Sequence, residues 1–173
     1  MLIVFTGNGK GKTTAAIGQA LRAIGNGSRV LMVQFIKGPW ESGEDKSSRE
    51  FGESFHIVKM GKGFVKSPCD KLPFEEHVKA AHDALAFSLS ELETGKWNIL
   101  ILDEVWVALS LGLLTPAEVD VFIDTATSQC KHLIMTGRGC PKHFMERADL
   151  VTEMLEIKHP FSSGVKTAKG VEF

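Results

Sequence analysis

The sequence has little cysteine, no excess of charge of one sign and no long uninterrupted apolar run. Its three cysteines, Cys69, Cys130 and Cys140, are widely separated and form no C-x-x-C pair. This pattern argues against a disulfide framework and against a zinc site, and it fits a reducing cytoplasm. The formal net charge of −1 gives no basic field that would attract nucleic acid or a membrane surface, so the expected partners are small molecules.

Neither a membrane span nor an export signal is predicted. The apolar stretch 99–114 is interrupted by Asp103 and Glu104. The chain begins at once with a strand-like run rather than with a basic segment followed by an apolar one, so a cytoplasmic protein is expected. Its 173 residues, 43% of them hydrophobic, suit one well-buried domain over 1–173 better than two.

Strand-like runs alternate with helical patterns along the chain. Strands are predicted at residues 2–5, 29–35, 55–58, 99–102, 132–135 and 150–157, and helices at 12–24, at 74–93 and from Thr115 onward. The polar stretch 37–53 is predicted to be a long loop with a functional role. The alternation predicts an α/β fold with a mostly parallel central sheet, helices on both faces and a ligand at the carboxyl ends of the strands.

The stretch TGNGKGKTT at residues 6–14 lies between a strand and a helix, which is the context of a phosphate-binding loop. Its glycines let backbone N–H groups converge, Lys12 supplies a mobile charge, and the Thr13 hydroxyl can bind Mg²⁺. The loop is one residue short of the usual G-x-x-x-x-G-K-[ST] pattern, because Thr6 stands where that pattern needs glycine. A turn that merely joins strand to helix does not account for two lysines and two threonines. The fold class is therefore P-loop NTPase-like (RecA-like), with three layers.

Two further polar groups follow predicted strands. Asp103 and Glu104 come directly after ILIL, and acids at the end of a buried strand are costly unless paired or coordinated. One of them is expected to complete a magnesium shell, the alternative being two acids that start an exposed loop. Arg138 stands between two glycines after HLIM, where its guanidinium can bind phosphate oxygens in pairs. The alternative is a solvated loop arginine.

Four other side chains are weaker candidates for a site. His77 and His82 lie five apart on a predicted helix, which is not metal-ligand spacing, and they are expected at the surface. Trp40 and Phe64 lie in polar loops, where each is either a stacking surface for a flat ligand or an anchor for its loop.

These motifs resemble those of the ATP:corrinoid adenosyltransferases of the CobA, CobO and BtuR type. The matching stretches are TGNGKGKTTAA (6–16), VQFIKG (33–38) with GE (43–44), the strand ending in Asp103-Glu104, TGRG (136–139), ADLVTEM (148–154) and KHPFSSGVKTAKGVEF (158–173). They are distributed over almost the whole chain, and the closing stretch is much more specific to this family than a phosphate loop is.

The resemblance implies transfer of the 5′-deoxyadenosyl group of ATP to the Co(I) centre of a reduced corrinoid, cobalamin or a precursor, with release of triphosphate. The reaction belongs to adenosylcobalamin biosynthesis or salvage. Because cobalt(I) is itself a strong nucleophile, the protein needs no catalytic serine or cysteine. A homodimer and an electron-donor protein such as a flavodoxin are implied as partners.

The resemblance also implies roles for individual residues. Catalysis is assigned to Lys12, Thr13, Glu104 and Arg138, and magnesium binding to Thr13, Asp103 and Glu104. Nucleotide binding is assigned to Gly7, Asn8, Gly9, Lys10, Gly11, Lys12, Thr13, Thr14, Lys37, Glu44 and Arg138. His159, Phe161 and the residues to Phe173 are expected to close the site over the corrinoid, and the short loop to receive the triphosphate in a reversed direction.

Two departures from the family pattern concern the corrinoid side. Relatives often carry an extension ahead of the first strand, so here that side is expected to be more open or completed by another subunit. Val65-Lys66-Ser67 stands where relatives commonly have a tryptophan.

The main alternative function is a RecA-like P-loop ATPase, followed by a nucleoside kinase and an ATP-binding regulator.

Overall fold

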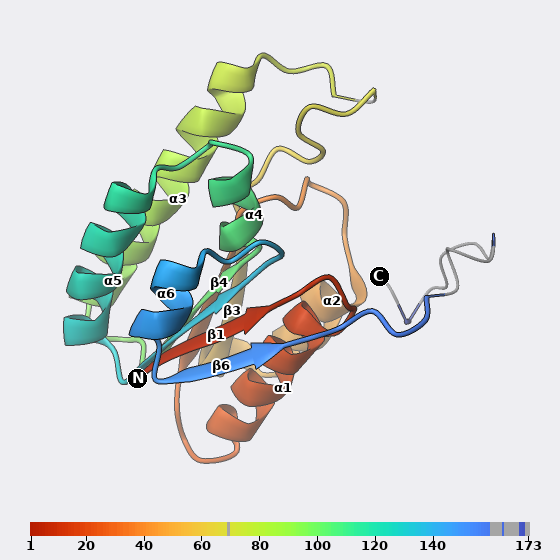
Figure 1. Ribbon diagram of the computed structural model, residues 1–173. Coiled ribbons are helices and arrows are strands. Elements are labelled where there is room, and N and C mark those ends of the chain that lie inside the picture. The colour runs from red at the N-terminus through yellow and green to blue at the C-terminus, as the bar shows by residue number, and fades with distance from the viewer. Residues whose placement is uncertain (69, 160–163, 165–169, 172–173) are drawn as a thin grey trace.

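The computed structural model of the chain describes residues 1–68, 70–159, 164, 170 and 171 (Figure 1). Strands and helices alternate along it. In chain order the elements are β1 (Leu2–Thr6), α1 (Lys12–Ile24), β2 (Val30–Gln34), α2 (Gly43–Arg49), the 3₁₀ turn η1 (Gly52–Ser54), β3 (Phe55–Lys59), α3 (Phe74–Glu93), β4 (Ile99–Asp103), α4 (Val105–Ser110), α5 (Pro116–Gln129), β5 (His132–Thr136), α6 (Lys142–Arg147) and β6 (Leu150–Glu153).

The strands form one six-stranded sheet in the order β3-β2-β4-β5-β1-β6. Every neighbouring pair is parallel, so all the carboxyl ends lie at the same edge. Strand β5 lies between β1, which leads into the phosphate loop, and β4, which ends in Asp103. The predicted α/β class and parallel sheet are confirmed, and the fold brings the polar residues that follow the strands to one edge.

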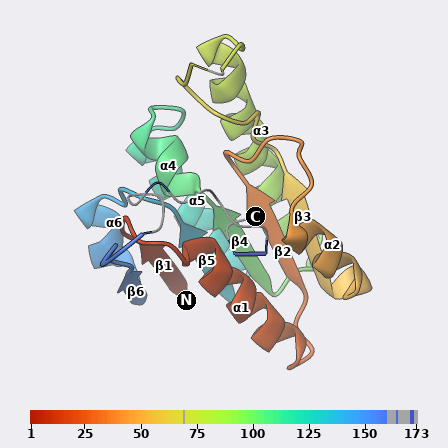
Figure 2. The same cartoon turned by 90° about the vertical axis from the view of Figure 1, so that its right-hand side faces the viewer.

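Two apolar clusters pack on opposite faces of the sheet. Leu100 and Leu102 belong to the cluster formed with α3, α4, α5 and α6, whereas Ile99 and Ile101 belong to the cluster formed with α1. Alternation along a strand explains this division, because successive side chains point to opposite faces. Figures 1 and 2 show the resulting three layers, with α1 and α2 on one face of the sheet and the other helices on the opposite face.

Local sequence signals explain where the predicted helices begin. Helix α5 has Thr115 as N-cap, with Pro116 in its first turn, and the Glu118 backbone N–H donates to the Thr115 hydroxyl. Helix α1 turns Ala16 and Ala20, both fully buried, toward the sheet. Small side chains on that face let the helix lie close to the strands, which places its N-terminus at their carboxyl edge.

The structure departs from the predicted elements in three places. The stretch 37–53 is not a continuous loop, because it contains α2 and η1; a capping box of Ser42 and Asp45 starts α2. Helices α4 and α6 were not predicted, since six residues are too few to display a helical period. The predicted strand 150–157 ends at Glu153.

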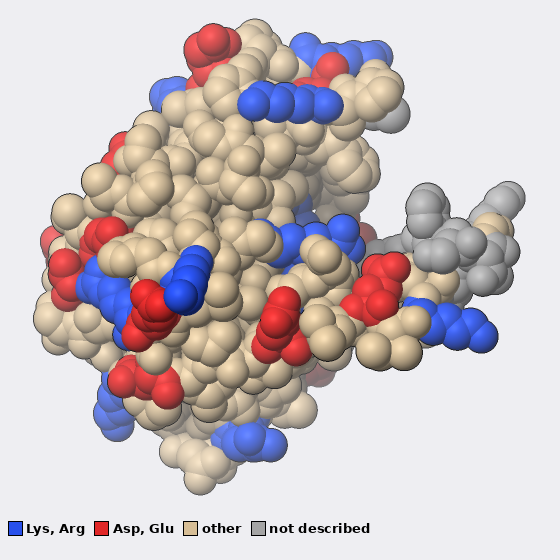
Figure 3. All heavy atoms as spheres, in the orientation of Figure 1, with Lys and Arg blue, Asp and Glu red and all other residues tan. Residues whose placement is uncertain are grey.

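On the face in Figure 3, acidic and basic side chains are interspersed rather than gathered by sign. No helix in the described ranges is both long and apolar enough to cross a bilayer.

Candidate active site

A cavity of about 1230 Å³ opens at the carboxyl edge of the sheet. The phosphate loop, the start of α1, helix α2 and the residues that follow β2, β4 and β5 line it. The lining includes all the predicted site residues except Gly7, Asn8 and Asp103: Gly9, Lys10, Gly11, Lys12, Thr13, Thr14, Lys37, Glu44, Glu104 and Arg138. The fold therefore gathers residues that are far apart in the sequence around one space.

The phosphate loop turns sharply into α1. Gly7 and Gly11 have φ angles of +94° and +114°, a region that favours glycine, and Gly11 is the N-cap of the helix. Lys12 is only 6% exposed, and its Nζ donates to the carbonyl oxygen of Gly9 at 2.6 Å. Burial lowers the pKa of Lys12, and this effect outweighs the opposing attraction of the Glu104 carboxylate. The loop thus holds a largely desolvated amino group at the helix N-terminus, where an anion binds favourably.

Asp103 lies behind the cavity wall, and its side chain is fully buried. Its Oδ1 accepts hydrogen bonds from the hydroxyls of Thr13 at 2.8 Å and Thr136 at 2.7 Å, and its Oδ2 accepts one from Nε2 of Gln34 at 3.0 Å. Burial raises the pKa of Asp103, while these three hydrogen bonds oppose the rise. Asp103 therefore fixes the orientation of the Thr13 hydroxyl and does not itself line the cavity.

Glu104 is the acid that faces the cavity. Its backbone has a φ of +62°, the left-handed region that costs a non-glycine residue roughly 1–2 kcal/mol, and its N–H donates to the Thr136 hydroxyl at 3.0 Å. Burial raises the pKa of Glu104, and the nearby Asp103 raises it further, whereas Lys12 and other cations oppose the rise. The left-handed turn points successive acids in different directions, which explains why one is buried and the other lines the cavity.

Thr136 and Gln34 belong to this network although they were not predicted as site residues. Thr136 is the first residue of the TGRG motif, and Gln34 is a polar residue at the end of an apolar strand. Both are fully buried and both donate to Asp103. A buried polar residue at the end of a parallel strand was the available signal, since such a group needs a partner at that edge of the sheet.

Lys37 and Glu44 form an ion pair across the cavity wall. Burial by itself would raise the pKa of Glu44, but the hydrogen bond and charge of Lys37 prevail and the pKa is lowered. Arg138 is exposed and follows Gly137, which has a φ of +139°. A Cβ on Gly137 would lie 2.9 Å from the Cβ of Trp106, so close packing against α4 sets the turn that directs Arg138.

Trp40 and Phe64 lie next to each other, with ring centroids 6.1 Å apart, and each is 64% exposed. The Trp40 ring rests on two glycines: a Cβ on Gly38 would lie 2.5 Å from a ring atom, and one on Gly63 would lie 3.2 Å from another. The ring is thus seated against both loops while much of its surface remains accessible, so both alternatives for Trp40 remain.

One histidine prediction is wrong. His77 is buried rather than at the surface, and its Nε2 lies 3.1 Å from Oδ1 of Asp70, which also accepts a hydrogen bond from the Leu72 backbone N–H. The turn before α3 folds back over the helix and covers it. His82 is exposed as predicted and lies 3.0 Å from Glu118. Within the described part of the chain, no group of three or more His, Cys, Asp or Glu residues is arranged to hold a metal ion.

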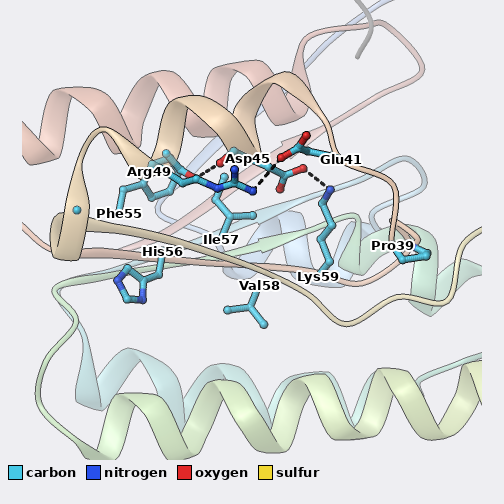
Figure 4. A pocket seen from close by; sticks show the side chains of 11 residues that line it. Pro39, Glu41, Asp45, Arg49, Phe55, His56, Ile57, Val58 and Lys59 are labelled. Atoms are coloured by element: carbon cyan, nitrogen blue, oxygen red, sulfur yellow. Dashed lines mark hydrogen bonds and ion pairs between the residues drawn. The ribbon is translucent and has the colours of Figure 1, made fainter.

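A second cavity, of about 490 Å³, lies between α2 and the edge strand β3 (Figure 4). Its charged side chains pair with one another: Asp45 with Lys59, and Glu41 with Arg49. Figure 4 shows the pair of Asp45 and Lys59 joining helix α2 to strand β3, whereas Glu41, in the loop before α2, pairs with Arg49 at the end of the same helix. The pair of Asp45 and Lys59 ties α2 to the sheet, while the neighbouring Glu44 lines the larger cavity.

The end of the chain reaches the larger cavity. His159, Gly170 and Val171 line it, and the closure of the site over the corrinoid by this segment stays a prediction. Phe161 and Phe173, which the prediction also included, and Cys69 lie outside the described residues.

Several known proteins are similar to this chain over its whole length. The model of the family "ATP:corrinoid adenosyltransferase BtuR/CobO/CobP" matches residues 1–173. A corrinoid adenosyltransferase of Pseudomonas aeruginosa is 40% identical over 175 residues, covering 100% of this chain and 83% of the relative. A corrinoid adenosyltransferase of Escherichia coli K12 is 36% identical over 173 residues, which cover 100% of this chain and 85% of that relative.

A solved structure is similar in fold alone. The flagellar accessory protein FlaH of Methanocaldococcus jannaschii superposes with a TM-score of 0.55 at 13% identity, over 88% of this chain and 69% of that protein. The family match spans every residue and the relatives match at full length of this chain, so the chain belongs to the ATP:corrinoid adenosyltransferase family.

Proposed function

We propose that this chain transfers the 5′-deoxyadenosyl group of ATP to the cobalt(I) of a reduced corrinoid and releases triphosphate. The observation that carries the proposal is the convergence of the phosphate loop, Glu104 and Arg138 on one large cavity, in a chain that belongs to this family over its full length. A cavity of about 1230 Å³ exceeds the usual 300–1,000 Å³ of a small-molecule site, which suits two substrates that must meet.

The reaction joins the two substrates directly. The cobalt–carbon bond forms at C5′ as the bond between C5′ and the triphosphate oxygen breaks, and the electron pair of that bond leaves with the triphosphate. The protein has to align C5′ with cobalt and to stabilise the departing negative charge. Lys10, Lys12, Arg138 and the N-terminus of α1 supply positive charge at the cavity, and Lys37 lines it in an ion pair with Glu44.

No protein nucleophile is needed for such a step, and the cysteines are consistent with that. Cys140 is buried, and burial raises the pKa of its thiol to about 12. Burial also raises the pKa of Cys130. Neither described thiol is therefore a ready thiolate, as expected when the attacking centre belongs to the substrate.

A magnesium ion fits the donors at the cavity. Thr13 and Glu104 both line it and offer oxygen atoms only, and the buried Asp103 holds the Thr13 hydroxyl in place. Magnesium is usually bound by one or two protein oxygens together with substrate phosphates, so a large protein cluster is not required. When bound, it would neutralise negative charge on the triphosphate. We assign Thr13 and Glu104 to the ion and Asp103 to orienting Thr13.

The corrinoid is proposed to approach from the side of Trp40 and Phe64, which do not line the cavity themselves; Trp40 lies on the same loop as the lining residues Ile36 and Lys37. Their accessible rings offer flat apolar surface to a macrocycle. His159 lines the cavity and belongs to the segment proposed to cover the substrate. A homodimer, a flavodoxin-like electron donor and a cytoplasmic location complete the proposal.

The proposal is tested by an anaerobic assay with ATP, magnesium and a chemically reduced corrinoid. The light-sensitive absorbance of the adenosylated product is followed, and triphosphate is separated from orthophosphate. Adenosylcorrinoid together with intact triphosphate is the expected result. Orthophosphate without a cobalt–carbon product would instead identify a RecA-like ATPase, which the fold alone also accommodates.

A further inference from the structure

The chain leaving β6 lies directly against the phosphate loop. The backbone N–H of Gly9, in the middle of the loop, donates to the carbonyl oxygen of Met154 at 2.7 Å, and the Met154 N–H donates to the carbonyl oxygen of Thr6 at 2.8 Å. Two segments that are about 145 residues apart thus share a pair of hydrogen bonds. Figure 1 shows β6 running beside β1 as the chain passes toward its C-terminal end.

The same contact determines where the loop needs glycine. A Cβ on Gly9 would lie 2.6 Å from the Leu155 carbonyl oxygen and 2.8 Å from that of Met154. A Cβ on Gly7 would lie 2.4 Å from the Met154 oxygen. Gly9 does not have a positive φ, so its backbone conformation is open to other residues and only the neighbouring backbone excludes a side chain.

We propose that Met154 and Leu155 form a brace that positions the phosphate loop for the triphosphate. The Gly9 N–H donates to Met154 and is therefore not available to phosphate. The other loop amides and Lys12, whose Nζ donates to the Gly9 carbonyl oxygen, bind the phosphate instead. The brace supports a loop that is one residue short and so lacks part of the usual ring of amides. The identity of the ligand, triphosphate, rests on the proposed function. The contact between Gly9 and Met154 does not, because it is present in the chain without a ligand.

The brace also links the loop to the far end of the cavity. Leu155 lies four residues before His159, which lines the cavity wall. A shift of His159 would therefore reach Gly9 through a short stretch of backbone. Met154 and Leu155 are positioning residues in this arrangement, since they act on the triphosphate through the loop and neither lines the cavity.

Amide hydrogen exchange of the full chain without nucleotide tests the brace. We expect the Gly9 amide to be protected by about 100-fold or more relative to an unstructured peptide, and adding ATP and magnesium to change this little. An amide reserved for phosphate would behave in the opposite way. Fast exchange of Gly9 in the free chain, followed by protection on ATP binding, would overturn the proposal.

Two alanine variants distinguish a role of Gly9 in packing against the brace from a role in letting phosphate approach the loop. Gly9→Ala should lower the thermal midpoint of the free chain, because the clash with Leu155 exists without ligand, whereas Gly18→Ala, with no atom within 4 Å of the added Cβ, should not. An unchanged midpoint for Gly9→Ala, with ATP binding alone weakened, would contradict the brace.

Kinetics supply the second readout. Met154→Pro removes the N–H that bonds Thr6 and should raise the KM for ATP by about tenfold, with the KM for corrinoid unchanged. Met154→Leu keeps the backbone bonds, and Leu155→Ala shortens only a side chain that is 67% exposed, so both should behave like the parent. Equal ATP KM values for Met154→Pro and Met154→Leu would sink the proposal. Loss of adenosyl transfer in the parent chain would instead refute the proposed function and leave the exchange result standing.

Discussion

The Thr13 hydroxyl donates to Oδ1 of Asp103 at 2.8 Å, which joins the phosphate loop to the acidic end of β4. These residues are 90 positions apart in the sequence and meet because β1 and β4 are separated only by β5 in a parallel sheet. Thr136 at the end of β5 donates to the same oxygen at 2.7 Å. The start of α1 and the ends of β4 and β5 thus contribute to one hydrogen-bonded group beneath the cavity.

This relationship predicts that Thr13→Val raises the magnesium concentration needed for half-maximal adenosyl transfer. Valine has nearly the same shape but has no hydroxyl to coordinate an ion, and it leaves Asp103 without one of its donors. Changes of this kind next to a metal typically cost about 10–100-fold in affinity. A magnesium titration of adenosylcorrinoid formation measures the shift. Thr13→Ser retains the hydroxyl and is expected to stay close to the parent; a serine variant as impaired as valine would show that packing is responsible.

Lys12→Ala is expected to reduce turnover by roughly 100-fold or more, because it removes a desolvated positive charge from the proposed leaving group. Initial rates of adenosylcorrinoid formation at saturating ATP and corrinoid provide the measurement. Lys142→Ala serves as the matched control, since Lys142 on α6 is 84% exposed in its side chain and pairs with Glu146 across one helical turn. Parent-like turnover in Lys12→Ala would remove this lysine from the charge stabilisation.

The spacing of apolar residues and the glycines between elements predicted most of the sheet and the helices α1 and α3, because these elements bury apolar residues at regular intervals. Helices α2, α4 and α6 escaped prediction since each is short and is held by packing or capping against the sheet. At the site, the loop motif located the phosphate-binding residues. Which of Asp103 and Glu104 faces the cavity could not be predicted, because it depends on the left-handed backbone at Glu104 and glutamate does not indicate such a conformation.

Glu104→Gln is expected to stabilise the free chain at neutral pH. Because the native Glu104 carboxyl has a raised pKa, it holds its proton to a higher pH than the unfolded carboxyl, and the free energy of unfolding falls as pH rises between the two pKa values. Glutamine removes that charge, so the midpoint should rise by about 2–4 °C for each 1 kcal/mol gained.

Thermal unfolding of both proteins at neutral pH and below the unfolded pKa measures the effect of Glu104→Gln. The difference between parent and variant should shrink as pH falls, because the parent carboxyl becomes neutral too. The same variant should need more magnesium for turnover if Glu104 contacts the ion. A variant less stable than the parent at neutral pH would mean that attraction to Lys12 outweighs the cost of burial, and an unchanged magnesium titration would exclude Glu104 from the metal site.

Trp40→Ala is expected to raise the KM for corrinoid by about tenfold while leaving the KM for ATP unchanged, since stacking on an aromatic face contributes roughly 1–3 kcal/mol to ligands of similar flatness. Steady-state kinetics with each substrate varied in turn distinguishes the two constants. Val121→Ala is the control, because Val121 is similarly exposed, at 66%, but lies on α5, which contributes no residue to the lining of the larger cavity. The alternative is that Trp40 only anchors its loop on Gly38 and Gly63. In that case Trp40→Ala would lower the thermal midpoint with the corrinoid KM unaltered, and the proposed approach of the corrinoid over Trp40 and Phe64 would be wrong.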